Sequence, residues 1–104
     1  MKAKKFIDDD EAFKQWRDNN PDGFILNLPR SSANNTRKFY IRAVKLHSAT
    51  CPTLQEDKNG EKQWTNNGYF KVCANDANDL IRWWDANADN TQFREPPRCK
   101  RCAP

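Results

Sequence analysis

The stretch Pro96-Pro97-Arg98-Cys99-Lys100-Arg101-Cys102 carries two cysteines separated by two residues, and a second group, His47-Ser48-Ala49-Thr50-Cys51, lies half a chain earlier. A Cys-x-x-Cys spacing lets both thiolates reach one ion while backbone amides point at the sulfurs. One more cysteine and a histidine complete a Cys₃His set, a normal composition for a structural zinc site. We therefore predict that one zinc ion staples the fold through His47, Cys51, Cys99 and Cys102.

The Cys99–Cys102 pair also has an interpretation as a redox-active dithiol. A redox Cys-x-x-Cys usually sits at the start of a helix in a βαβ context. Here Pro104 follows Cys102 by two residues, so we expect no helix after the pair. This expectation favours metal binding over redox chemistry.

The fourth cysteine, Cys73, offers an alternative to His47 as the fourth ligand, which would leave His47 as a solvated or hydrogen-bonded turn residue. Free cysteine is, however, among the most buried residue types. We favour Cys73 as a buried strand cysteine and His47 as the ligand, and the alternative stays open on the sequence alone.

The composition is that of a polar but folded chain. Its 104 residues are 37% apolar and 31% charged, yet they include four Trp, six Phe and two Tyr. Disordered chains lack aromatic residues, so we expect a small aromatic core. The length suits a single domain over residues 1–104. Because a domain of this size has a thin margin of stability, a metal staple would help it.

The N-terminus, Met1-Lys2-Ala3-Lys4-Lys5-Phe6, has no apolar core of a signal peptide, and no apolar run approaches the length of a membrane span. We therefore expect a cytoplasmic protein with no membrane contact. Thiols stay reduced in that compartment, so four cysteines indicate metal ligands rather than two disulfides.

Local patterns predict two helices. Asp8, Asp9 or Asp10 can cap the first, whose apolar residues share one face, and Pro21-Asp22-Gly23 ends it. Asn75 or Asp76 can cap the second, which contains Leu80, Ile81, Trp83 and Trp84.

Three segments are typical of strands: 23–28, 39–46 and 69–74, with 39–46 the strongest. Polar loops are expected over 30–38, over 55–68, where Trp64 stands alone, and over 85–95. The sequence thus predicts an α+β fold with a short antiparallel sheet, two helices and at least two of the four tryptophans in the core.

The segment 46–104 resembles the Ada-type metal-binding domain, the zinc module of bacterial alkylation-repair regulators. The resemblance rests on Leu46-His47-Ser48-Ala49-Thr50-Cys51-Pro52, on the strand 69–73 with the helix after it, and on Cys99-Lys100-Arg101-Cys102-Ala103-Pro104. The insert 54–68 is longer than the family pattern, and Pro97-Arg98 replaces a direct Pro-Cys. The whole chain also resembles uncharacterised small bacterial domains that carry Gly-Phe-x-x-Asn, Leu-His, Trp-Thr and Lys-Val-Cys-Ala.

The Ada resemblance implies an activity in which the first ligand thiolate accepts a methyl group. His47 occupies that position here, and a zinc-bound imidazole has no comparable nucleophilicity, so we expect no alkyl acceptance. No Ser/His/Asp set is visible in the sequence, and three glycines do not make a phosphate loop. We therefore expect a binding module and not an enzyme.

Basic residues gather in two stretches of a chain whose net charge is +4 and whose pI is about 9.0. If the fold joins these stretches, they form one phosphate-binding face. Otherwise they are ordinary solvated surface. The prediction is a nucleic-acid-binding module that uses Arg37, Lys38, Arg42, Arg98, Lys100 and Arg101. The alternative is a protein-interaction adaptor or inhibitor, of the kind that a short bacterial or phage chain could be, with zinc purely structural.

Overall fold

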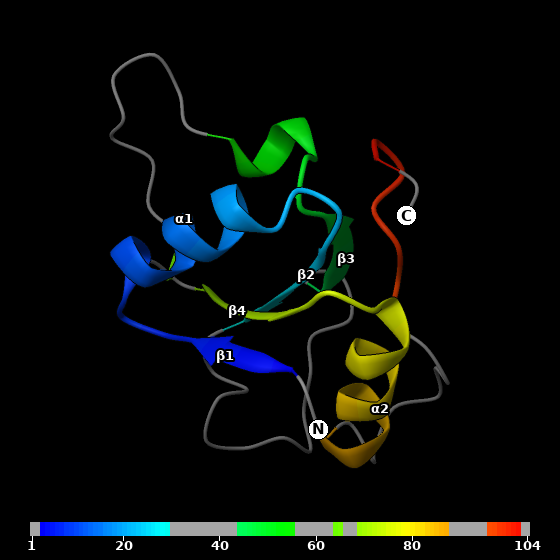
Figure 1. Cartoon of the computed structure of the whole chain (residues 1–104). Helices are drawn as coiled ribbons and strands as arrows, with labels where there is room; N and C mark the ends of the chain where they lie inside the picture. The colour runs from blue at the N-terminus through cyan, green and yellow to red at the C-terminus, as the bar shows by residue number, and fades with distance from the viewer. Residues whose placement is uncertain (1–2, 30–43, 56–63, 66–68, 88–95, 103–104) are drawn as a thin grey trace.

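The computed structural model describes residues 3–29, 44–55, 64–65, 69–87 and 96–102. Its elements, in chain order, are β1 (Lys4–Phe6), α1 (Asp10–Asn19), β2 (Phe24–Pro29), β3 (Lys45–Ser48), a 3₁₀ turn (Pro52–Leu54), β4 (Tyr69–Ala74) and α2 (Ala77–Asn87). The fold is α+β, as the sequence predicts, and Figure 1 shows the elements together.

The four strands of the described residues form one sheet in the order β1-β4-β2-β3, with every neighbouring pair antiparallel. Strand β4 therefore lies between β1 and β2, which come from the N-terminal part of the chain. The segment 46–104 therefore shares its sheet with the residues before it.

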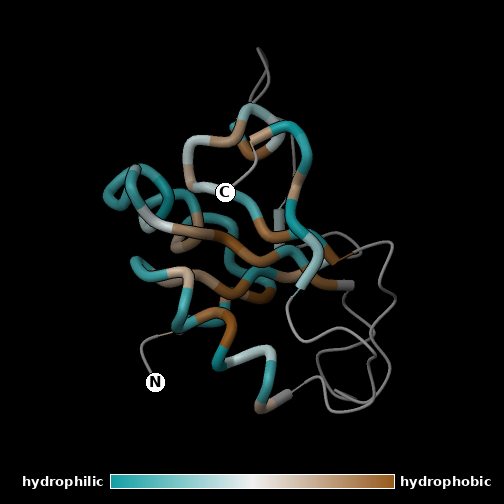
Figure 2. Tube along the Cα trace, turned by 90° about the vertical axis from the view of Figure 1, so that its right-hand side faces the viewer, coloured by the Kyte–Doolittle hydropathy of each residue, from teal (hydrophilic) through white to brown (hydrophobic). Residues whose placement is uncertain are grey.

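In the described part of the chain, one helix covers each face of the sheet (Figure 1). Successive side chains of a strand point to opposite faces. On one face Leu26 and Val72 pack with Leu80 and Trp84 of α2. On the other, Ile25 packs with Phe13 of α1 and with residues of the loops that follow β3. Figure 2 shows the hydrophobic residues concentrated along the strands, which is where the two small cores lie.

Side-chain caps fix where both helices begin. The Asp9 carboxylate accepts a hydrogen bond from the Ala12 amide at 3.1 Å, and Asp76 accepts one from the Asn78 amide at 2.9 Å. Each satisfies a backbone donor that the first helical turn leaves without a partner. The structure thus selects one residue from each predicted group of caps. None of the helices in the described ranges is long and apolar enough to cross a lipid bilayer.

Strand β4 has the predicted bounds, and β2 differs from its prediction by one residue at each end. The strongest predicted strand, 39–46, needs a correction. Its residues 39–43 lie outside the described ranges, and β3 continues to Ser48, so His47 is inside the strand and does not follow it. Strand β1 was not predicted, because three residues that include Lys4 and Lys5 carry too short a pattern.

Trp64, which stands alone in a polar stretch of the sequence, is a core residue with only 2% of its surface exposed. Trp84 is 1% exposed, so the prediction of at least two core tryptophans is confirmed. Asp10 holds the Trp64 segment against α1: its carboxylate accepts hydrogen bonds from the amide of Trp64 at 3.0 Å and from the amide and hydroxyl of Thr65.

Replacing Asp10 by asparagine is expected to destabilise the fold by about 1–3 kcal/mol at neutral pH, because buried donors lose a charged acceptor. Burial raises the pKa of Asp10, but the hydrogen bonds from Thr65 and Trp64 outweigh burial and leave the pKa below its ordinary 3.8. The stability that the ionised Asp10 carboxylate adds to the fold is therefore fully present above pH 3.8. It is lost as the pH falls through the lowered pKa of Asp10. Urea unfolding of Asp10→Asn at pH 7 and pH 3 measures it. The exposed neighbour Glu11, changed to glutamine, is the control; an equal loss there would contradict the assignment to these hydrogen bonds.

Candidate metal centre

Strand β3 positions the first predicted ligand. Its pairing with β2 places His47 opposite Ile25, on the face of the sheet that α1 covers. The histidine is 7% exposed, so its ring lies inside the protein and not on a turn surface.

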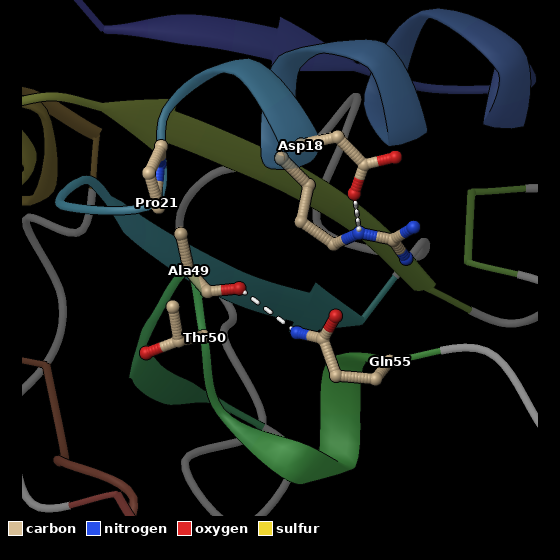
Figure 3. A pocket seen from close by; sticks show the side chains of 6 residues that line it. Asp18, Pro21, Ala49, Thr50 and Gln55 are labelled. Carbon is tan, nitrogen blue, oxygen red and sulfur yellow. Dashed lines mark hydrogen bonds and ion pairs between the residues drawn. The ribbon is translucent and has the colours of Figure 1, made fainter.

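A tight turn carries the chain from His47 to the second ligand. The Cys51 amide donates to the Ser48 carbonyl at 3.0 Å, and the Leu54 amide donates to the Cys51 carbonyl at 2.9 Å. The Gln55 side chain then donates to the carbonyls of Ala49 and Cys51, at 3.0 and 3.2 Å. Figure 3 shows the amide of Gln55 reaching back to Ala49. The spacing between His47 and Cys51 is therefore fixed by hydrogen bonds on both sides of the turn.

The C-terminal segment reaches the centre by running parallel to β3, beside it (Figure 1). The Leu46 amide donates to the Pro97 carbonyl at 2.7 Å, and the Cys99 amide donates to the Leu46 carbonyl at 2.8 Å. Hydrogen bonds thus hold Cys99 beside Leu46, and the residue that follows Leu46 is His47, the predicted histidine ligand.

These three pieces of chain bring the predicted ligands together. One donor atom from each of His47, Cys51, Cys99 and Cys102 lies within 4.8 Å of all the others. The sulfurs of Cys51 and Cys99 are 3.9 Å apart. Two sulfurs that each lie about 2.3 Å from a tetrahedral zinc ion are about 3.8 Å apart, so this separation fits a shared ion. The group could hold a metal ion, as the sequence predicts.

The hydrogen bonding and the protonation of His47 also fit a metal ligand. Its Nδ1 is buried and has no hydrogen-bond partner among the described residues. Buried polar atoms are rarely left in that state, and a metal ion would satisfy the ring. Burial, followed by the positive charges of Lys71 and Lys45, lowers the pKa of His47 to about 4. The imidazole is therefore neutral at physiological pH, which is the form that binds metals.

Backbone amides surround the Cys-x-x-Cys sulfurs. Burial raises the pKa of Cys99, but hydrogen bonds from the amides of Cys102 and Arg101 outweigh it and leave the pKa lowered. The Ser48 amide donates to the Cys102 sulfur at 3.4 Å. Burial dominates at Cys102 and raises its pKa. Such amides stabilise thiolates, which is the arrangement expected from the Cys99–Cys102 spacing.

Cys73, the alternative fourth ligand, lies elsewhere. It pairs with Ile25 across β4 and β2, and Ile25 pairs with His47 across β2 and β3. Cys73 and His47 are thus in one row of the sheet but two strands apart, about 10 Å. Cys73 is fully buried in the core, and burial raises the pKa of its thiol. It is not part of the group of donor atoms.

A shallow depression lies on the outer side of the turn, lined by Arg17, Asp18, Pro21, Ala49, Thr50 and Gln55 (Figure 3). Its two charged residues already have partners in the protein. The Arg17 guanidinium bonds Asp18 at 3.0 Å and the Leu54 carbonyl at 2.9 Å. Arg17 therefore supports the turn of the metal centre through the Leu54 carbonyl. The residues that line the depression supply none of the four donor atoms of the centre.

The predicted basic residues divide into two sets. Arg98, Lys100 and Arg101 are exposed on the segment that carries the last two ligands. Arg37, Lys38 and Arg42 lie outside the described ranges. The sequence did not indicate the residues that position the ligands, Leu46 and Gln55, because their role depends on contacts with distant backbone.

Comparisons with family models, with curated proteins and with solved structures give no match, so no family is shown for this chain. The geometry of the centre is the observation on which a function can be built.

Proposed function

We propose that the ion is zinc and that its role is structural. Three thiolates and one imidazole are a ligand set that zinc favours, and structural zinc sites are four-coordinate and tetrahedral. The ending Cys99-Lys100-Arg101-Cys102-Ala103-Pro104, with its resemblance to the Ada-type domain, supports this role. A fourth protein ligand leaves no open position for water or substrate, so the proposed site is not a hydrolytic centre, and we propose a binding module rather than an enzyme.

We propose further that the domain binds the phosphate backbone of nucleic acids. The observation that carries this proposal is the placement of Arg98, Lys100 and Arg101, which are all exposed on the segment that carries the last two ligands. That segment is tied to Leu46 by two backbone hydrogen bonds, and two of its residues belong to the metal group.

Anchoring of this kind lowers the cost of binding. Residues between two ligands of one ion cannot move independently of it, so their backbone loses little entropy when a phosphate binds. Arginine also contacts phosphate through two parallel N–H groups. Arg37, Lys38 and Arg42 would extend the same surface if their segment lies beside the Cys99–Cys102 pair.

Binding is expected to be weak, tolerant of sequence and strongly dependent on salt, because phosphate contacts carry no base information. Replacing Arg98, Lys100 and Arg101 together by alanine should lower affinity at least about tenfold at low salt and reduce the slope of log K against log salt by roughly 2 to 3. Fluorescence anisotropy with labelled duplex and single-stranded oligonucleotides, at several salt concentrations, measures both quantities. Zinc content and thermal unfolding should stay as in the wild type.

A charge-matched pair of variants separates a local contact from net charge. Lys100→Ala/Arg101→Ala and Lys4→Ala/Lys5→Ala each remove two positive charges, and Lys4 and Lys5 lie on β1 at the opposite edge of the sheet from β3. Only the first pair should weaken binding substantially. A wild type with no affinity for DNA or RNA at low salt ends the nucleic-acid proposal and leaves the protein adaptor or inhibitor in its place.

A further inference from the structure

The three cysteines of the metal centre differ in how far the whole residue is exposed to solvent. Cys51 is 1% exposed and Cys99 is 8% exposed, whereas Cys102 is only partly buried. Oxidation of cysteine follows thiolate character and exposure. A metal ligand has thiolate character at each of the three sulfurs, so exposure decides among them. A small oxidant that diffuses from solvent therefore meets Cys102 first.

Cys102 has two other cysteine sulfurs close to it. The Cys102 sulfur lies within 4.8 Å of the Cys99 and Cys51 sulfurs, and two residues separate Cys102 from Cys99 in the chain. A sulfenic acid condenses with a neighbouring thiolate to give a disulfide. Cys73 is fully buried and is not part of the donor group, so it takes no part in this reaction.

We infer that the metal centre is sensitive to oxidants. A peroxide oxidises Cys102, and the oxidised residue forms a disulfide with Cys99, so that the ion is released. The Cys102 thiolate attacks one peroxide oxygen of hydrogen peroxide, which gives a sulfenic acid and a hydroxide ion. The Cys99 thiolate then attacks the Cys102 sulfur, forms the S–S bond and expels a second hydroxide ion. The two sulfurs lose two electrons in total and the peroxide gains them. With Cys99 and Cys102 joined, His47 and Cys51 would be the two donors left of the four, and they would no longer hold the ion.

Oxidation of the centre changes how the segment 96–102 is held. Two backbone hydrogen bonds join Pro97 and Cys99 of this segment to Leu46. Beyond the Cys99 amide, the hydrogen bonds described between this segment and the rest of the chain run through sulfur, from Ser48 to Cys102 and between Cys51 and Cys99. Loss of the ion therefore frees the backbone that carries Lys100 and Arg101. This last step depends on the proposed nucleic-acid function, and it lowers affinity for phosphate when the centre is oxidised.

The test of the chemistry needs no nucleic acid. Zinc-loaded full-length protein is treated with hydrogen peroxide, zinc release is followed with a chromogenic chelator, and the disulfide is located by peptide mass spectrometry. Release should accompany formation of the Cys99–Cys102 disulfide, and dithiothreitol with added zinc should reverse both. Cys102→His keeps four ligands without an oxidisable atom at the accessible position and should slow release about tenfold. Cys73→Ala is the control and should release zinc at the wild-type rate.

Differential alkylation of the wild type keeps the test decisive if Cys102→His does not retain zinc. Release of zinc while Cys102 remains a free thiol, or oxidation of Cys102 without release, overturns the inference. The regulatory step is tested separately by oligonucleotide binding before and after oxidation. Equal affinity in the two states overturns the regulation. A wild type that binds no oligonucleotide in either state overturns the proposed function alone, because zinc release and disulfide mapping are read without it.

Discussion

Replacing Cys99 by serine is expected to release the metal and to unfold the part of the chain that the centre holds together. Structural zinc contributes an apparent 10–16 kcal/mol of folding free energy in small domains at neutral pH. Whole domains are stable by only about 5–15 kcal/mol, so loss of the ion removes most of the margin. Serine offers no thiolate to the ion, and the hydroxyl would be left in a site that is 8% exposed.

Metal content by mass spectrometry and thermal unfolding by circular dichroism measure this effect. The wild type should hold about one zinc ion per chain. Cys99→Ser should hold none and should lose its cooperative transition or melt far below the wild type. Treatment of the wild type with a strong chelator should reproduce the variant. A wild type that is fully folded without metal would contradict the structural role of the ion.

Replacing His47 by alanine is expected to weaken zinc retention far more than replacing Cys73. His47 supplies one of the four donor atoms, and Cys73 lies two strands away in the core. Loss of an outer-shell partner already costs roughly 10- to 100-fold in metal affinity, and loss of a ligand should cost more. Cys73→Ala removes only packing atoms, which costs about 1–2 kcal/mol of stability and leaves metal affinity unchanged.

Competition with a chelator of known affinity gives the two zinc affinities, and urea unfolding of the zinc-loaded proteins gives the two stabilities. His47→Cys is the matched variant, because a thiolate at that position restores four donors and should recover tight binding. Cobalt substitution provides a second readout, since the intensity of its visible bands reports tetrahedral coordination and its charge-transfer bands grow with the number of thiolates. The opposite ranking of the two alanine variants would transfer the fourth ligand to Cys73 and reopen the assignment of the turn after β3.

Part of this structure could be predicted from local patterns. The bounds of β4 follow from a short apolar run, and the helix starts follow from aspartates that accept bonds from amides within the next turn. These features depend on residues that are close in sequence, so local sequence patterns predict them. The four candidate ligands could be named for a different reason: few residue types bind zinc, and the spacing from Cys99 to Cys102 is itself a geometric requirement.

Other features depended on pairings between distant residues. The choice between His47 and Cys73 was open in the sequence, because histidine and cysteine both bind zinc. Only the order β4-β2-β3 separates them by two strands. Trp64 looked isolated in a polar stretch, yet its burial comes from packing against Phe13 and from Asp10, more than fifty residues earlier. The short strand β1 is defined by its pairing with β4, more than sixty residues later in the chain.

The sequence by itself therefore determined which donor types the centre contains, because the residue types and the short spacings between them are properties of the sequence. The tertiary structure decided which donors meet. It did so through backbone hydrogen bonds that no side-chain pattern encodes, such as those that place Cys99 beside Leu46 and so bring the C-terminal segment to His47. Coordination is a local property of residue type, whereas the convergence of three remote segments is set by sheet order and by the burial of two small cores.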